Sequence, residues 1–166
     1  MDIADTTSTA QVLTFALGDE VFAIDIRNVR EIVQVGAMTA VPLMPAFVRG
    51  VMNLRGAVVP VIDLHARFGH APATLGKKSC IVIYDAGGGG ERADIGLLVD
   101  AVSEVVELAP DAQEPPPAFG AALRRDFIRA MGKLRGRFVV IVEPEMAFDI
   151  GAMASLCESM HEPCPS

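Results

Sequence analysis

The chain has 166 residues, of which 51% are hydrophobic, 21% charged and only 5% aromatic, with no tryptophan and one tyrosine. This composition is typical of one folded unit, or of two small subdomains sharing a core, and it argues against a disordered chain. The net charge of −7 argues against a general nucleic-acid binder, which needs a basic surface, and against attraction to an anionic membrane.

The first ten residues are polar, with neither a basic start nor an apolar run, and we expect residues 1–10 to be a flexible lead and not a signal peptide. No stretch of the chain reaches the roughly 18 apolar residues of a membrane-spanning helix. We therefore expect a cytoplasmic protein without direct membrane insertion. Three cysteines, an odd number, are typical of reduced thiols.

The first predicted elements are two short strands and a brief helix. Strands are predicted at Gln11–Leu17 and Glu20–Ile24, because the Gly18-Asp19 pair between them favours a hairpin. Asp25 then stands where a helix N-cap would, and the spacing of apolar residues predicts a short helix within residues 26–33.

The middle of the chain predicts a second hairpin, with strands Val51–Leu54 and Ala57–Asp63 on either side of Arg55-Gly56. Gly56 can take a positive φ without steric cost, which a tight reversal of this kind requires. The hairpin would therefore present Arg55 at its tip. The residues after the second strand favour one helical turn that is closed by Gly69.

Five further strands are predicted, at Ser79–Tyr84, Ala93–Val99, Val102–Leu108, Phe127–Leu134 and Arg137–Val142. The last two flank a second Arg-Gly pair, at residues 135 and 136, which hints at two similar β units in tandem. Pro144 opens an apolar pattern with helical spacing that continues towards the C-terminus. Many short strands separated by frequent turns predict a mainly β barrel or sandwich.

No segment predicts a phosphate-binding loop. Gly87–Gly90 lack the third glycine of a dinucleotide-binding loop, and a predicted strand follows where a helix is needed. In the segment LGKKS, Lys78 occupies the position where serine or threonine should follow Lys77. We therefore interpret residues 87–90 as a flexible hairpin tip, and the sequence predicts no ATP site.

The titratable residues predict no catalytic or metal centre. His65 and His70 belong to no metal-binding motif, and we expect both at the surface. The cluster best suited to a soft metal is formed by Cys157, His161 and Cys164, where a fourth ligand would have to come from a nearby glutamate. No serine or cysteine shares a motif with a base. We expect no enzyme, no cofactor and no bound metal.

Four segments in the same order resemble the CheW family, the scaffold proteins that couple bacterial chemoreceptors to the histidine kinase CheA. They are LTFALGDEVFAIDIRNVREI (13–32), VPLMPAFVRGV (41–51) continued by GVMNLRGAVVPVIDL (50–64), ADIGLLVDAVSEVVEL (93–108), and the closing pair of strands at 127–142. The resemblance implies a CheW-like domain over residues 11–150, followed by a helix or tail over 151–166.

The resemblance also implies a fold. It is mainly β, with two five-stranded SH3-like β-barrel subdomains packed side by side, a groove between them, short helices and a C-terminal helix. We expect that helix to cover one end of a barrel.

The resemblance implies a receptor-binding site formed by Val29, Glu31, Gly50, Asn53 and Arg55. We expect Glu31 and Arg55 to form an ion pair across the groove, and the Asn53 side chain to anchor the turn. Recognition would place a receptor helix in this groove.

Two details of the binding surfaces stay open. Val29, Val48 and Met52 could be apolar anchors or ordinary core. Phe119 matches an aromatic position that the family uses to contact the kinase, and it could equally be tucked beneath its own loop.

The function that the resemblance implies is a non-catalytic adaptor. Its partners would be the cytoplasmic tip of a methyl-accepting chemoreceptor and the regulatory domain of a CheA-type kinase, with no nucleic acid involved. One alternative is an adaptor of a related kinase pathway that controls pili or surface motility. Another, of a different class, is a small β-barrel protein that binds a ligand or nucleic acid.

Overall fold

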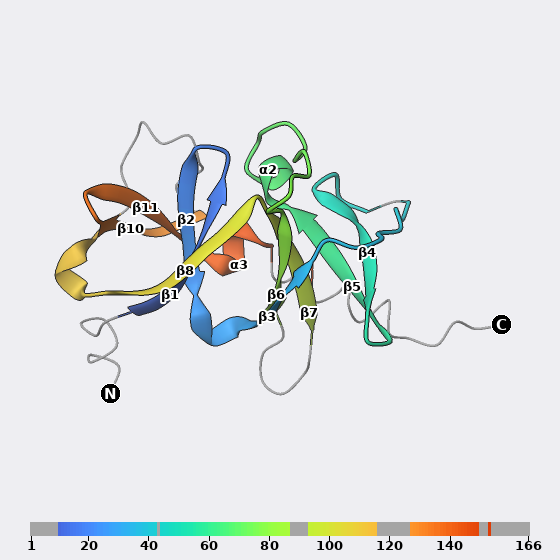
Figure 1. The fold of residues 1–166 in the computed structure, drawn as a ribbon, viewed down its shortest axis with the longest axis horizontal. Coiled ribbons are helices and arrows are strands. Elements are labelled where there is room, and N and C mark those ends of the chain that lie inside the picture. The colour runs from blue at the N-terminus through green and yellow to red at the C-terminus, as the bar shows by residue number, and fades with distance from the viewer. Residues whose placement is uncertain (1–9, 43, 87–92, 116–126, 150–152, 154–166) are drawn as a thin grey trace.

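The computed structural model describes residues 10–42, 44–86, 93–115, 127–149 and 153. Within these residues the protein is mainly β, as the sequence predicts, with two sheets side by side (Figure 1). No helix among the described residues is long and apolar enough to cross a membrane.

The first sheet has six strands in the order β8-β1-β2-β11-β10-β9. Neighbouring strands are antiparallel except β2 and β11, which are parallel. The strands are β1 (Ala10–Leu17), β2 (Glu20–Asp25), β8 (Ala101–Leu108), β9 (Gln113–Glu114), β10 (Ile128–Leu134) and β11 (Arg137–Val142). The resemblance implies five strands in this subdomain, and the two-residue strand β9 is the sixth.

The second sheet has five strands in the order β3-β6-β7-β5-β4. Here too one pair is parallel, β5 with β7, and the other neighbours are antiparallel. The strands are β3 (Val29–Gln34), β4 (Val48–Leu54), β5 (Ala57–Asp63), β6 (Cys80–Asp85) and β7 (Asp94–Val99).

The two sheets repeat one design, which confirms the two similar units that the Arg-Gly pairs hint at. Strands β3-β6-β7-β5-β4 correspond in order and direction to β8-β1-β2-β11-β10. The registers agree as well, since Val61 faces Gly96 in one parallel pair and Ile141 faces Ala23 in the other. The repeat is not in tandem, because the N-terminal hairpin β1–β2 takes the place in the six-stranded sheet that β6–β7 take in the other.

Within the described residues, four short helical segments follow or connect the strands. The helical segments are η1 (Ile26–Asn28), α2 (Leu64–Arg67), η2 (Pro110–Ala112) and α3 (Pro144–Ala147). Helix α2 follows β5 and is capped by the Asp63 carboxylate, and α3 follows β11 and is capped by Glu143 in the same way. Gly69, at φ 91°, closes the turn after α2 as predicted.

The helix predicted within residues 26–33 is wrong beyond its first turn. Asp25 is the predicted N-cap, because its side chain accepts a hydrogen bond from the Arg27 backbone N–H. The helix that it caps is only a single 3-10 turn, Ile26–Asn28. From Val29 the chain is strand β3, paired with β6. The β-branched residues here suit a strand, and pairing with β6 gives every second backbone group a partner that an isolated helical turn would lack.

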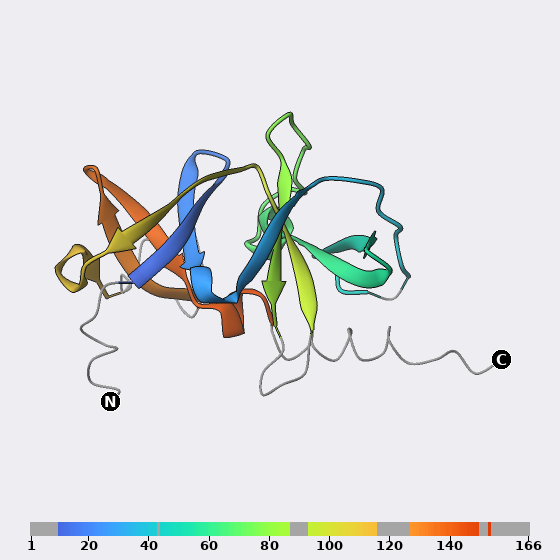
Figure 2. The ribbon, with the colours of Figure 1, turned by 60° about the horizontal axis from the view of Figure 1, so that its bottom comes forward.

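The described residues form three groups of buried side chains. One lies within each sheet, around Val61 and Ile83 in the five-stranded sheet and around Val139 and Leu108 in the six-stranded sheet. The third and largest joins the two sheets and includes Phe15, Phe22 and Ile24 from one and Ile62, Val82, Ile95 and Leu97 from the other. The subdomains therefore meet through a packed core. Figure 2 shows the strands of the two sheets side by side.

The predicted C-terminal helix begins at Pro144, where expected, but its described part is short. Helix α3 ends at Ala147, and Asp149 has a positive φ of 51°. Phe148 and Met153 are fully buried in the core that joins the sheets. The predicted tail at 151–166 lies outside the described residues except for Met153.

Burial of the single tyrosine gives a prediction about alkaline pH. Tyr84 is 4% exposed and packs edge to face against Phe148, with ring centroids 5.4 Å apart. Burial of the hydroxyl raises its pKa from 10.0 to about 12. The pKa of Tyr84 is higher in the folded than in the unfolded protein, so the buried neutral hydroxyl contributes to the free energy of unfolding. This contribution is fully present below pH 10 and is lost as the pH rises towards 12.

Ultraviolet absorbance of the phenolate tests this directly, since no other tyrosine or tryptophan contributes. We expect a midpoint near 12 in the folded protein, with circular dichroism confirming that the strands persist, and near 10 in denaturant. A folded-state midpoint near 10 would show that Tyr84 is accessible to solvent.

Candidate functional site

The β4–β5 corner presents Arg55 on a fixed turn, as the sequence predicts. Arg55 and Gly56 both have positive φ, 53° and 86°. The Asn53 side-chain oxygen accepts a hydrogen bond of 3.0 Å from the Gly56 backbone N–H, which confirms that Asn53 anchors the turn. The Arg55 side chain is 69% exposed. A long cation therefore stands in solvent on a backbone that is held in place.

Glu31 and Arg55 form the expected ion pair. The two terminal guanidinium nitrogens of Arg55, Nη1 and Nη2, each donate to one carboxylate oxygen of Glu31, at 2.5 and 2.6 Å. Two parallel bonds fix the plane of the guanidinium as well as its position. The hydrogen bonds that Arg55 donates to Glu31 raise the pKa of Arg55.

The expected placement of this pair across the groove is wrong. Glu31 lies on β3 and Arg55 at the end of β4, and these are the two outer strands of the same five-stranded sheet. The pair thus joins the two edges of one subdomain. Most of the space between the subdomains is filled by the joining core.

The apolar residues beside this corner divide into core and surface. Met52 is 8% exposed and belongs to the core of the five-stranded sheet. Val29 and Val48 are half-buried against the joining core. Ile32, which the sequence analysis did not single out, is 45% exposed, one position beyond Glu31 on the outer face of β3. The alternation of β3 would have revealed it, had this segment been read as a strand.

Gly50 has a structural role at this corner. A Cβ at this position would lie 2.7 Å from the backbone oxygen of Thr39, where Val51 and Thr39 exchange two backbone hydrogen bonds. Gly50 therefore lets the segment before β4 approach the strand closely.

We expect Gly50→Ala to lower the free energy of unfolding by about 1–3 kcal/mol, because the added methyl group forces two backbones apart. Urea denaturation would measure the loss. Gly36→Ala is the matched control, since a Cβ there meets nothing within 4 Å. Equal effects of the two substitutions would contradict the role assigned to Gly50.

The six-stranded sheet carries a second corner of the same design. Arg135 and Gly136 have φ values of 52° and 79°, and Arg135 donates to both carboxylate oxygens of Glu104 on β8, at 2.5 and 3.1 Å. The hydrogen bond from Arg135 lowers the pKa of Glu104. The second Arg-Gly pair pointed to this corner in the sequence, but nothing there identified Glu104 as its partner.

Arg67 ties the two subdomains together. From α2 it donates to the Ala147 backbone oxygen at 2.8 Å and to that of Met146 at 2.7 Å, both on α3. Its guanidinium also lies 4.7 Å from the ring centroids of Phe47 and Phe127, which precede β4 and β10 respectively. One arginine thus contacts corresponding aromatic rings in both repeats.

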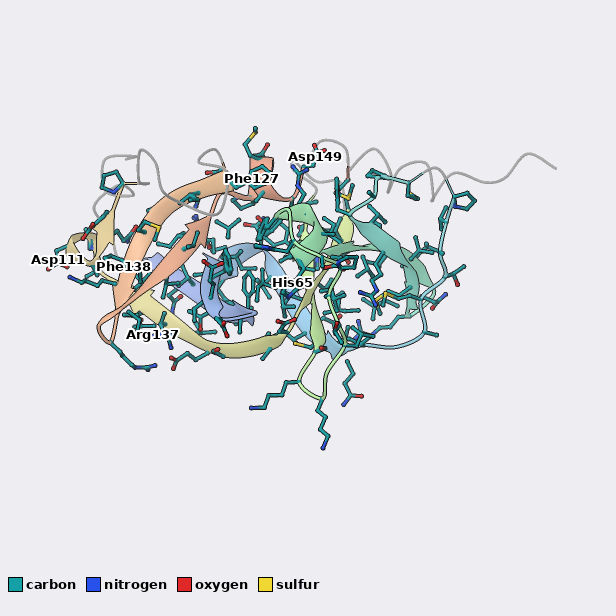
Figure 3. All side chains as sticks on the ribbon, turned by 90° about the horizontal axis from the view of Figure 1, so that it is seen from above. His65, Asp111, Phe127, Arg137, Phe138 and Asp149 are labelled. Atoms are coloured by element: carbon teal, nitrogen blue, oxygen red, sulfur yellow. The ribbon has the colours of Figure 1, made fainter. Side chains whose placement is uncertain are left out.

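His65 is a second link between the subdomains, and its predicted surface position is wrong. Its side chain is only 17% exposed, and Nε2 lies 3.0 Å from an Asp100 carboxylate oxygen. Asp100 also accepts a hydrogen bond of 2.7 Å from the Gly18 backbone N–H in the β1–β2 turn. Figure 3 shows His65 near the middle of the molecule. His70 is exposed, as expected.

Among the described residues, no group of three or more histidine, cysteine or acidic side chains could hold a metal ion. Burial raises the pKa of the Cys80 thiol, which disfavours the reactive thiolate. The cluster of Cys157, His161 and Cys164 lies outside the described residues, as do Gly87–Gly90 and Phe119.

Fold and site together define a mainly β protein of two repeated subdomains, whose candidate functional surface is an exposed arginine–glutamate corner. Residues 11–150 match the model of the CheW-like domain. The chain therefore belongs to the CheW-like domain family.

Similar proteins support this assignment. A probable chemotaxis protein CheW of Rhizobium etli is 37% identical, over 83% of this chain and 86% of that protein. The chemotaxis protein CheW of Klebsiella aerogenes is 32% identical, over 92% and 89% of the two chains. The crystal structure of the scaffolding protein TtCheW of Thermoanaerobacter tengcongensis superposes with a TM-score of 0.75 at 33% identity, covering 84% of this chain and 92% of that one.

Proposed function

We propose that this protein is a non-catalytic chemotaxis adaptor that couples the cytoplasmic tip of a methyl-accepting chemoreceptor to the regulatory domain of a CheA-type kinase. Family membership supports the adaptor role. The observation that carries the receptor site is the Glu31–Arg55 pair, in which an exposed cation is fixed by two hydrogen bonds on a rigid turn. In this role the protein would work in the cytoplasm, at receptor arrays.

The β4–β5 corner suits recognition of a helix. A helix that presents an acidic side chain could pair with Arg55, while its apolar side chains contact the partly buried Val29, two residues before Glu31 on β3. Because Glu31 already holds the guanidinium in one orientation, little side-chain entropy would be lost on binding. Asn53 and Gly50 would not contact the receptor themselves. They would hold the backbone of the turn that presents Arg55.

The kinase would bind elsewhere on the protein. Phe119 remains our proposed contact there, on the strength of the family resemblance alone. Separate surfaces for the two partners are what an adaptor requires, since it must hold both at once.

The test is a three-component sedimentation assay with a receptor cytoplasmic fragment reconstituted on vesicles, the purified kinase regulatory domain and this protein. We expect the regulatory domain to sediment with the vesicles only when this protein is added. Omitting it, or replacing it by an unrelated acidic β protein, should leave the regulatory domain in the supernatant. If the kinase domain does not sediment in the presence of this protein, the adaptor proposal is wrong.

A further inference from the structure

The β10–β11 corner differs from the β4–β5 corner in charge and in aromatic content. The strand registers are the same, so each residue of one corner has a counterpart in the other. Three counterparts differ in kind, with the β4–β5 residue first in each pair: Asn53 and Lys133, Ala57 and Arg137, Val58 and Phe138. The second corner therefore adds two cations and one aromatic ring to the shared design of a paired arginine and glutamate.

These added side chains are exposed to solvent. Phe138 is 56% exposed, and the Lys133 ammonium lies 5.8 Å from the centre of its ring. Arg137 is exposed and forms no ion pair with any described residue. Figure 3 shows Arg137 and Phe138 on the six-stranded sheet, well away from His65 at the junction. This turn is locally basic, although the net charge of the protein is −7.

A cavity of about 350 Å³ lies beside the Phe138 ring. Val21, Met131 and Val140 contribute apolar side chains to its lining, and Arg137 lines it as well. Asp19 and Glu20, on the β1–β2 turn, line the cavity as well. The lining therefore combines apolar side chains with the Arg137 cation on the β10–β11 hairpin and two carboxylates on the β1–β2 turn.

We propose that the β10–β11 corner is a second docking surface, distinct from the Glu31–Arg55 corner, for an acidic protein segment that inserts an apolar side chain beside Phe138. Carboxylates of that segment would pair with Lys133 and Arg137, whose charges are not matched by an ion pair within the described residues. The cavity has room for an apolar side chain, and an exposed aromatic ring beside it provides the contact that typically dominates such interfaces.

Nucleic acid fits this surface less well. A strand would need several cations along its path and more than one exposed ring for its bases. Here the cations are confined to one turn, and Asp19 and Glu20 would repel phosphate from the neighbouring turn. An acidic protein segment can instead place its carboxylates at the hairpin and an uncharged side next to the β1–β2 turn.

The probe is a synthetic helical peptide of glutamate and leucine, titrated into the full-length isotope-labelled protein. We expect amide shifts centred on residues 131–140. Lys133→Glu combined with Arg137→Glu should weaken binding about tenfold or more, because like charges then face each other. Phe138→Ser should weaken it as well. Lys77→Glu combined with Lys78→Glu is the matched control, since it changes the charge equally at another exposed site and should leave affinity within about twofold.

Several results would overturn the proposal. They are an equal loss in the control, equal binding of a peptide with serine in place of leucine, equal binding of a lysine–leucine peptide, or tighter binding of a single-stranded oligonucleotide. Absence of any binding would overturn it too. The assay uses neither receptor nor kinase, so its failure would leave the proposed adaptor function untouched.

Discussion

Replacing Asp63 by alanine is expected to lower the free energy of unfolding by about 3–5 kcal/mol, because it removes a buried carboxylate that pairs with Arg49 and accepts backbone hydrogen bonds. Asp63 is 2% exposed. Its carboxylate accepts hydrogen bonds from the His65 N–H, which caps α2, from the Ala73 N–H at 2.9 Å and from Arg49 Nη1 at 3.2 Å. The substitution would leave the buried Ala73 N–H without this partner, and the partly exposed Arg49 guanidinium would keep its hydrogen bond to the Ala73 oxygen but lose its counter-ion.

The internal repeat supplies the control for this prediction. Glu143 stands at the corresponding position, caps α3 and pairs with Arg129 at 3.1 Å, but its side chain is 28% exposed against 3% for Asp63. Glu143→Ala should therefore cost about 1 kcal/mol, close to the value of one helix cap. Urea denaturation of both variants measures the difference. Similar losses for Asp63→Ala and Glu143→Ala would show that burial of Asp63 is not what makes it important.

Arg67→Ala should lower the free energy of unfolding by about 3 kcal/mol, the second largest loss we expect. The variant loses two hydrogen bonds from a charged donor, of about 1.5–3 kcal/mol each, and the contacts with two aromatic faces. It also leaves the carbonyl oxygen of the buried Ala147 without this donor. Relaxation of the surrounding residues and solvent access to Met146 keep the expected loss below the sum of these contributions.

Arg27→Ala is the control for Arg67, because the Arg27 side chain is 82% exposed and pairs with a residue two positions away. We expect a change within about 0.5 kcal/mol for this variant. If Arg67→Ala were equally mild, Arg67 would not be the link between the subdomains that its contacts indicate.

Most of the fold could be predicted because the strands have clear ends. The bounds of β5 and β11 are those predicted, since each begins directly after an Arg-Gly turn. Residues 26–33 were misassigned, because an N-cap followed by apolar residues at helical spacing also describes a 3-10 turn that leads into a strand. Only pairing with β6, about fifty residues away in the chain, decides between them.

The relation between the subdomains could not be predicted, because the repeat is interlaced. A tandem repeat would place all strands of one subdomain before those of the other. Here the N-terminal hairpin β1–β2 belongs to the same sheet as β8 to β11, so a search for tandem similarity compares the wrong segments. Arg67 and His65 were missed for a related reason. Their partners, Ala147 and Asp100, are distant in the sequence, and an arginine bound to backbone oxygens leaves no complementary residue to find.

The candidate site was predicted in its residues but not in its placement. Arg55 and Asn53 follow from the turn itself, and the Glu31 pairing follows from the family resemblance. That the pair closes one sheet, and does not bridge two subdomains, depends on β3 and β4 being the outer strands. Neither the spacing nor the residue types carry that information.

The most direct test of the account is the affinity of a receptor cytoplasmic fragment for three proteins, measured by isothermal titration. They are the wild type, Arg55→Ala and Arg135→Ala. The two variants remove the same side chain from corresponding corners, and each arginine is 69% exposed, so both should fold equally well. We predict that Arg55→Ala abolishes receptor binding while Arg135→Ala retains the wild-type affinity. Equal binding by Arg55→Ala and wild type, or equal loss in both variants, would contradict the assignment of the receptor site to the Glu31–Arg55 corner.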